Sequence, residues 1–159
     1  MKKSSGGKAA LIEELGNVVV RWQDATQKYD EAVGEIYGLG PAERLCLSFL
    51  WRGPQTASAI AREIRLTPAA VTALIDRLEK RGFVRRKADP GDRRKVLVEA
   101  AEATQKVTAE AYLPLRDAGA ESLAKYSEAE LKVVAEVLDD SLRIQEEMTR
   151  RLLERHGKA

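Results

Sequence analysis

The eleven residues from 85 to 95 read RRKADPGDRRK and hold six cations, two acids, a proline and a glycine. The cations form two identical triplets, one on each side of Asp89-Pro90-Gly91-Asp92. This tetrapeptide predicts a type II turn, because proline favours the second position and glycine supplies the positive φ that the third position requires. The β-prone runs Phe83-Val84 and Val96-Leu97-Val98 flank it. We therefore predict a β-hairpin with a strongly basic tip.

A basic hairpin tip can bind an anionic polymer. Arginine guanidinium groups bind phosphate oxygens, and they also enter the narrow, electronegative minor groove of DNA. We expect Asp92 to orient an arginine side chain, foremost that of Arg94, through a charge-assisted hydrogen bond. An oriented guanidinium group loses less entropy when it enters a groove. A solvated surface hairpin is the alternative interpretation, and the density of charge favours the first.

The charge of the chain is concentrated in its middle. The whole sequence of 159 residues has a net charge of only +2. Residues 56–98 hold 11 lysines and arginines against 5 acidic residues, a net charge of +6, so the rest of the chain carries −4. This asymmetry indicates an anionic partner for the middle segment.

Two short helices are predicted immediately before the hairpin. The first spans about 57–64, with Thr56 as its cap. The second spans about 67–81, where Thr67 is a capping residue and Pro68 takes the first helical position. A short connection between two such helices is typical of a helix-turn-helix.

The second of these helices is predicted to have two distinct faces. The buried stripe, at helical spacing, consists of Val71, Leu74, Ile75 and Leu78. The opposite face consists of Ala69, Thr72, Ala73, Asp76, Arg77 and Lys80. Thr72 can hydrogen-bond a base in a major groove, while Ala69 and Ala73 can contact thymine methyl groups. The N–H groups at the start of the helix can bind phosphate. An ordinary amphipathic surface helix is the alternative, and the adjacent basic hairpin favours DNA contact.

The sequence predicts further helices on both sides of this segment. Apolar residues at spacings of three and four predict a long helix over about 9–36 and a second helix over about 41–51. After the hairpin, a helix over about 100–126 is expected to bend or break near Pro114 and Gly119. The fold class is therefore mainly α with one small β-hairpin.

The composition excludes several kinds of site. Cys46 is the only cysteine and His156 the only histidine, so the sequence holds no disulfide and no His/Cys cluster for a metal. It contains no glycine-rich phosphate loop and no nucleophile–base pair, and we expect neither enzyme activity nor a cofactor. No apolar run is long enough to span a membrane. We expect a cytoplasmic protein with a disordered tail over residues 1–8.

The block from 56 to 98, TASAIAREIRLTPAAVTALIDRLEKRGFVRRKADPGDRRKVLV, resembles the MarR family of winged helix-turn-helix transcriptional regulators. The resemblance rests on the leucine-rich run ending at Gly82, the Phe-Val-Arg-Arg strand, the Asp-x-x-Asp-Arg-Arg wing and the long flanking helices. It implies an N-terminal dimerisation helix over 9–40, a winged helix-turn-helix DNA-binding domain over 41–99 and C-terminal dimerisation helices over 100–159.

The resemblance also implies a function. It implies a homodimeric repressor that binds a pseudo-palindromic double-stranded DNA operator, with helix 67–81 in the major groove and wing 85–95 at the minor groove. It implies relief by a small aromatic or phenolic effector, and the candidate pocket residues are Trp22, Trp51 and Tyr112. The candidate DNA-binding residues are Thr56, Ser58, Thr67, Pro68, Ala69, Ala70, Thr72, Ala73, Arg77, Arg86, Asp92, Arg93, Arg94 and Lys95.

Dimerisation is also expected from the residues themselves. The helix over 9–36 and a final helix that begins at the capping box Ser127-Glu128-Ala129-Glu130 both carry long apolar stripes. A small winged-helix core cannot cover both stripes, so we expect a second subunit to do so, and a single intramolecular bundle is the alternative.

Two other functions compete with this interpretation. A winged helix can serve protein–protein contact, with the basic hairpin engaging an acidic partner. A DNA-binding regulator can also respond to oxidation of Cys46. That residue lies among Leu45, Leu47 and Phe49, which favours a buried small hydrophobe over a redox sensor.

Overall fold

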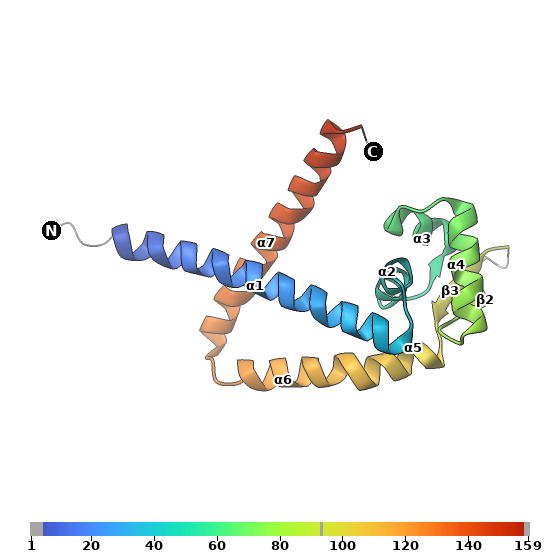
Figure 1. The fold of residues 1–159 in the computed structure, drawn as a ribbon, viewed down its shortest axis with the longest axis horizontal. Helices are drawn as coiled ribbons and strands as arrows, with labels where there is room; N and C mark the ends of the chain where they lie inside the picture. The colour runs from blue at the N-terminus through green and yellow to red at the C-terminus, as the bar shows by residue number, and fades with distance from the viewer. Residues whose placement is uncertain (1–4, 93, 158–159) are drawn as a thin grey trace. The chain divides into compact units, whose positions relative to one another are not determined.

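The computed structural model describes residues 5–92 and 94–157 (Figure 1). The chain forms two compact units, one ending at Tyr112 and the other beginning at Leu113. Helices and one small antiparallel sheet make up the first unit, and the second is helical. The mainly α fold class with a hairpin wing is confirmed.

Helix α1 spans Ser5–Tyr37 and therefore begins before the predicted start at Ala9. Residues 5–8, which we assigned to a disordered tail, are helical, and residues 1–4 lie outside the described part of the chain. Adding residues to an existing helix avoids the cost of helix nucleation. Residues 5–8 can therefore continue the helix that the apolar residues after them form. The helix ends at Gly38, whose φ of +62° is a conformation that glycine adopts without strain.

Helices α2 (Pro41–Leu50), α3 (Ala57–Ile64) and α4 (Pro68–Lys80) pack with the sheet around one core. Arg65, at φ 54° in the left-handed region, makes the turn between α3 and α4. The largest fully buried side chains are Cys46, Ile60, Val71, Leu74, Ile75, Leu78, Val84 and Val98. Burying one aliphatic side chain of this size stabilises a fold by about 1.5–3 kcal/mol, so this shared core fixes α4 against its neighbours.

The sheet has three short strands in the order β1-β3-β2, all antiparallel: β1 (Gln55–Thr56), β2 (Val84–Ala88) and β3 (Val96–Ala100). Strands β2 and β3 form the predicted hairpin. Strand β1 was not predicted, because two residues carry no periodic signal. It pairs Gln55 with Val98 and so ties the start of α3 to the wing.

The segment after the sheet differs from its prediction in part. Helix α5 (Glu102–Val107) continues as the π-helical turn η1 (Thr108–Tyr112) and then as α6 (Leu113–Leu123). The irregularity near Pro114 is confirmed, and it lies just before the proline, where a wider turn relieves the clash between the ring and preceding carbonyls. The helix is not interrupted at Gly119, which lies inside α6.

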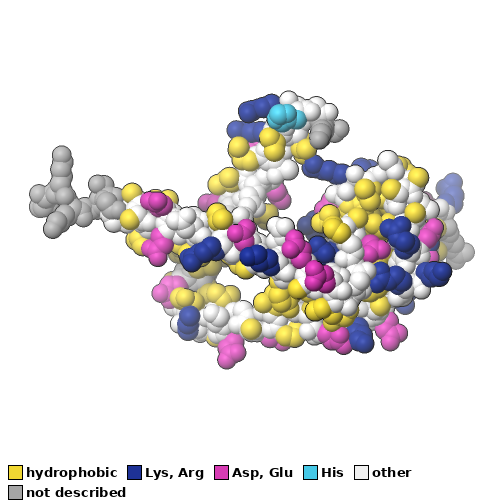
Figure 2. Space-filling view, in the orientation of Figure 1, with side chains coloured by type: hydrophobic (Ala, Val, Ile, Leu, Met, Phe, Trp, Pro, Cys, Tyr) yellow, Lys and Arg dark blue, Asp and Glu magenta, His cyan; other side chains and the backbone are white. Residues whose placement is uncertain are grey.

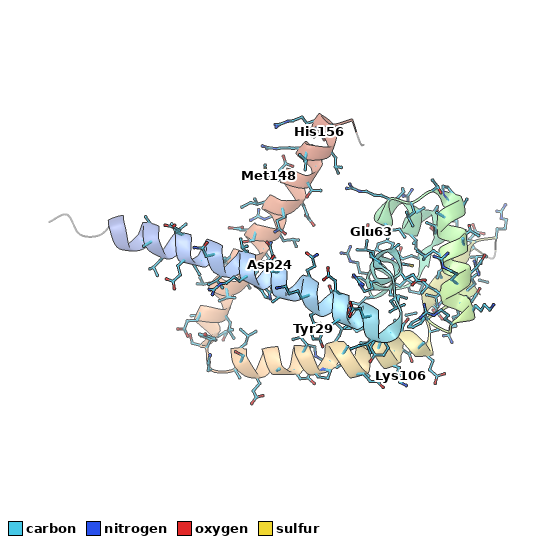
Figure 3. All side chains as sticks on the ribbon, viewed as in Figure 1. Asp24, Tyr29, Glu63, Lys106, Met148 and His156 are labelled. Atoms are coloured by element: carbon cyan, nitrogen blue, oxygen red, sulfur yellow. The ribbon has the colours of Figure 1, made fainter. Side chains whose placement is uncertain are left out.

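Tyrosine hydroxyls attach η1 to α1 within the first unit. Tyr29 donates to the carbonyl of Ala111 at 2.7 Å, and Tyr112 donates to the carboxylate of Asp30 at 3.0 Å. Figure 3 shows Tyr29 on the side of α1 that faces this segment. These bonds hold the C-terminal half of α1 against η1.

In the second unit, α7 (Glu128–Arg155) begins at the predicted capping box. The carboxylate of Glu130 accepts the N–H of Ser127 at 2.8 Å, and the hydroxyl of Ser127 accepts the N–H of Glu130 at 3.3 Å. Hydrogen bonds from the side chain and backbone of Ser127 hold the pKa of Glu130 below its usual range. Among the described residues, no helix is long and apolar enough to cross a membrane.

Candidate nucleic-acid interface

Helix α4 presents one face to the core and the other to solvent. The predicted inward residues are buried, each at most 1% exposed: Val71, Leu74, Ile75 and Leu78. The exposed outward residues are Pro68, Ala69, Ala70, Thr72, Ala73, Asp76, Arg77 and Lys80. The N-terminal half of this outward face holds only small side chains, which allows a close approach to another surface.

The hydroxyl of Thr72 donates to the carbonyl of Pro68 at 3.0 Å, one turn earlier in α4. Since this bond uses the hydroxyl proton, the oxygen is left as an acceptor. In a major groove it would face a donor such as the amino group of adenine or cytosine. Ala69 and Ala73 share the face with Thr72 and add no polar group to it.

The other candidate hydroxyl residues lie at helix N-termini. Thr56 accepts the N–H of Ala59 at 3.2 Å, and its hydroxyl lies 3.1 Å from that of the exposed Ser58. Thr67 accepts the N–H of Ala70 at 3.3 Å. Both threonines are therefore helix caps, as predicted, and each opens a helix whose positive dipole end favours an anion.

The tip of the wing has a different backbone from the one we predicted. Gly91 is not among the glycines with positive φ, so the type II turn was wrong. The carboxylate of Asp89 instead accepts the N–H of Gly91 at 2.8 Å, and that of Asp92 accepts the N–H of Arg94 at 3.1 Å. These are side-chain-to-backbone turns of the kind that aspartate favours. The side chain of each aspartate thus determines the conformation of the loop by accepting a backbone N–H of the loop.

The expected brace between Asp92 and the Arg94 side chain is also corrected. The guanidinium nitrogen Nε of Arg94 lies 3.7 Å from Asp92, beyond hydrogen-bonding distance. The Arg94 side chain is 96% exposed, and Lys95 Nζ lies 3.7 Å from the other oxygen of Asp92. Arg93, also a candidate, lies outside the described residues. Asp92 positions the chain at the tip and leaves the arginine side chain extended into solvent.

The first basic triplet is largely neutralised within the protein. Arg85 donates to Glu99 on the neighbouring strand at 2.6 Å, and Lys87 pairs with the same carboxylate. Lys87, followed by Arg85, holds the pKa of Glu99 below its usual range. These two cations stabilise the hairpin, so the charge offered to a partner is concentrated at the tip rather than spread along both strands.

Arg86 is bound between two carboxylates of α4. Its guanidinium group donates to Asp76 at 2.5 Å and also bonds Glu79, and its backbone N–H donates to Glu79 at 2.9 Å. These hydrogen bonds, that with Asp76 foremost, raise the pKa of the Arg86 guanidinium. The candidate DNA-binding residue Arg86 therefore fixes the wing to α4. Figure 2 shows Lys and Arg side chains gathered over this part of the first unit.

Comparison with known proteins identifies the family to which the chain belongs. Residues 41–96 match the model of the MarR family. Over 128 residues the chain is 33% identical to the HTH-type transcriptional regulator YcgE of Bacillus subtilis, covering 80% of this chain and 83% of that protein. The chain belongs to the MarR family. It is a DNA-binding transcriptional regulator, as members of the family are, and not an enzyme.

Solved structures share the MarR fold. A MarR-like regulator from Thermotoga maritima is 25% identical and superposes with a TM-score of 0.61 over 82% of this chain and 95% of its own. A MarR family protein from Bacillus stearothermophilus is 22% identical, with a TM-score of 0.59 over 92% of this chain and 99% of its own. The order of helices and strands along this chain is therefore that of the MarR fold.

The structure does not bring the candidate effector residues of this MarR protein into one enclosed pocket. Trp22 on α1 is 57% exposed, and Trp51, at the end of α2, is 70% exposed. Tyr112 lies edge-on to Tyr29, with ring centroids 6.2 Å apart. Burial and the bond to Asp30 raise the pKa of Tyr112 to about 12. In a single chain, these three side chains do not enclose a ligand.

Cys46 is fully buried in the core, as we predicted for a small hydrophobe. Burial, followed by the charge of Glu43, raises the pKa of the Cys46 thiol to about 12. Because the thiolate is the form that oxidises, this environment opposes a redox switch in this MarR protein.

Glu43, Asp76, Glu79 and Glu99 were not among the candidate site residues, yet they determine which cations face outward. Arg77 Nε lies 3.7 Å from Glu43, which is only 8% exposed. The pairing of Arg85 with Glu99 follows from the strand register. A four-residue turn over 89–92 would instead place Arg85 opposite Val96. The incorrect turn prediction therefore gave no reason to expect the pairing of Arg85 with Glu99.

Proposed function

We propose that this MarR protein binds a specific, pseudo-palindromic operator as a homodimer. The observation that carries the proposal is the outward face of α4, where small exposed residues precede Arg77 and Lys80 while the opposite face is buried. Such a helix can enter a major groove closely enough for side chains to reach base edges. Its fixed core packing supports a single orientation of that face.

The candidate residues divide into four roles in this proposal. Ala69, Thr72 and Ala73 contact base edges from the N-terminal half of α4. Phosphate contacts come from the helix N-termini and from exposed cations, and the candidates for them are Thr56, Ser58, Thr67, Ala70, Arg77 and Lys95. Pro68 has no N–H group and can contact a partner only through its ring. Arg86 and Asp92 position the wing rather than contact DNA, as their bonds to α4 and to the tip backbone indicate. Arg94, the wing arginine of the Asp92-Arg93-Arg94 triplet, reaches the minor groove, and Arg93 remains a DNA-binding candidate.

Dimerisation is supported by apolar side chains that a single chain leaves exposed. On α1 they are Leu11, Ile12, Leu15, Val18, Val19 and Trp22. On α7 they are Val133, Val134, Val137, Leu138, Leu142, Ile144, Met148 and Leu152. Monomeric proteins rarely expose long continuous apolar faces. We assign dimer contacts to residues 9–40 and 100–159 and DNA contacts to residues 41–99.

The regulatory direction is repression, relieved by a small aromatic or phenolic effector, in the cytoplasm. The support for this part is the family resemblance. Trp22 is open in a single chain, so an effector site that includes it needs a wall from the second subunit. A ligand there would bind the dimer and not the isolated chain.

Two measurements on the purified protein test the proposal. Sedimentation equilibrium should give twice the chain mass of 17.6 kDa at micromolar concentration. Binding to a promoter-derived duplex should weaken steeply with salt, with log affinity falling by about 0.9 per phosphate contact for each unit of log salt. A monomer at all concentrations would contradict the dimer. Equal affinity for random DNA of the same length would contradict sequence-specific binding.

A further inference from the structure

The C-terminal end of α4 is attached to the junction between α1 and α2. Arg81, which follows α4, donates from Nη1 to the carbonyl of Gly38 at 2.9 Å and from Nη2 to the carbonyl of Tyr37 at 2.8 Å. These carbonyls lie at the C-terminal end of α1, where the helix dipole favours a cation. The bonds join residues 43 and 44 positions apart in the sequence.

Glu43 of α2 completes this attachment from the other side. Its carboxylate is 3.7 Å from Arg81 Nη1 and, through its other oxygen, 3.7 Å from Arg77 Nε. It also accepts the N–H of Gly40 at 2.9 Å, which holds it in the bend between α1 and α2. One buried carboxylate therefore faces two arginines that both belong to the end of α4.

The geometry requires arginine at position 81. Its planar fork donates to two carbonyls at once, and its guanidinium carbon lies 4.9 Å from the centre of the Phe83 ring. A lysine ammonium is a point charge that cannot reproduce this combination. A Cβ at Gly38 would come within 3.3 Å of Arg81 Nη2, so glycine also leaves room for the fork.

We propose that Arg81 is a positioning residue for DNA binding, because it fixes the angle of α4 against α1 and so sets the distance between the two recognition helices of a dimer. This inference rests on the proposed homodimeric function. Helix α4 has 13 residues. At a rise of 1.5 Å per residue, a tilt of about 5° at the clamped end moves the other end by about 1.7 Å. The bonds from Arg81 to Gly38 and Tyr37 thus determine the position of the end of α4 that carries Thr72, although Arg81 itself does not contact DNA.

Half-site spacing is the readout that separates positioning from stability. One added base pair moves a half-site by about 3.4 Å and rotates it by about 34°, since a turn of DNA holds about 10.5 base pairs. A general loss of stability lowers affinity for every spacing by the same factor. A loosened α4 instead lets the dimer accept spacings that the wild type rejects.

The experiment uses the full chain and a set of duplexes made from one half-site recovered by selection from randomised DNA. The two copies of the half-site are placed at the best spacing and at one base pair more or fewer. We expect the wild type to prefer the best spacing about tenfold, which is comparable to the cost of one mismatched base pair in a specific site. Arg81→Ala should prefer the best spacing by about threefold or less. Lys80→Ala, which removes a neighbouring exposed cation, should lower all affinities and keep the wild-type ratio.

Arg81→Lys keeps the charge and provides the test if Arg81→Ala does not fold at the assay temperature. It should show the same broadened spacing preference, because one ammonium group cannot hold both carbonyls. An unchanged spacing ratio in either folded variant overturns the inference and leaves the homodimeric function standing. A wild type with no preferred spacing overturns both.

Discussion

Glu79 holds Arg86 at two points, by accepting its backbone N–H at 2.9 Å and by pairing with its guanidinium group. The last turn of α4 is thereby attached to the strand that leads into the wing. The two DNA-binding elements, helix and wing, therefore move together within the first unit. In the proposed complex with DNA, a wing fixed in this way would reach the minor groove at a set distance from α4.

Glu79→Ala is expected to weaken operator binding, since it releases β2 from α4. Glu79→Gln keeps an acceptor for the Arg86 N–H and should cost less affinity and less stability than the alanine variant. Exposed ion pairs contribute only about 0–1 kcal/mol, so the loss of unfolding free energy should stay near that size. Fluorescence anisotropy and urea unfolding measure both quantities. Equal effects of alanine and glutamine on both would contradict a role for the backbone bond.

Arg94→Ala is expected to weaken DNA binding and leave the unfolding free energy unchanged, because its side chain is 96% exposed. If Arg94 contacts one phosphate or the minor groove, the salt dependence should lose about one unit of slope. Arg85→Ala is the matched control, since that arginine is already paired with Glu99. If the slope falls equally in both variants, Arg94 at the exposed tip contributes no more to DNA binding than Arg85, which is paired on the strand, and the proposed role of the tip is wrong.

Asp92→Asn separates two explanations of the wing acid. The structure has Asp92 accepting the N–H of Arg94, and asparagine can make the same turn without a charge. We expect Asp92→Asn to bind operator at least as tightly as the wild type and Asp92→Ala to bind less tightly. If asparagine were as damaging as alanine, the charged brace that we first expected from the sequence would be the correct account.

Cys46 should be unreactive in the folded protein. With the pKa of its thiol raised to about 12, almost none is thiolate at pH 8, and its side chain is fully buried. A disulfide reagent such as DTNB should modify it only in denaturant, and peroxide should not release bound DNA. Rapid modification of the native chain, with loss of binding that a reductant reverses, would support the redox alternative. Cys46→Ala is the control that assigns any such effect to this thiol.

The sequence predicted the parts of the site that depend on neighbouring residues. The faces of α4 follow from the spacing of Val71, Leu74, Ile75 and Leu78, and its start follows from the cap Thr67 with Pro68 after it. These signals lie within one helix, so a single sequence contains them. The same holds for the capping box of α7.

The parts that the sequence did not predict depend on competition or on distant partners. At the wing tip, the side chains of Asp89 and Asp92 bond the backbone and outcompete the turn that Pro90-Gly91 favours. Arg81 finds its carbonyl partners more than 40 positions away, which no local pattern encodes. A count of charged residues also does not show which charges are paired: Arg86 was counted as a DNA-binding cation, but it bonds Asp76 and Glu79.

Selection of bound duplexes from a fully randomised DNA pool tests the central claim most directly. For the wild-type protein the account predicts a recovered motif of two inverted half-sites, with centres about one helical turn apart, 10–10.5 base pairs. Recovery of such a motif would support both the recognition by α4 and the two-fold symmetry. A pool that stays random after repeated rounds, or a motif with one unrepeated half-site, would contradict a homodimeric, sequence-specific regulator.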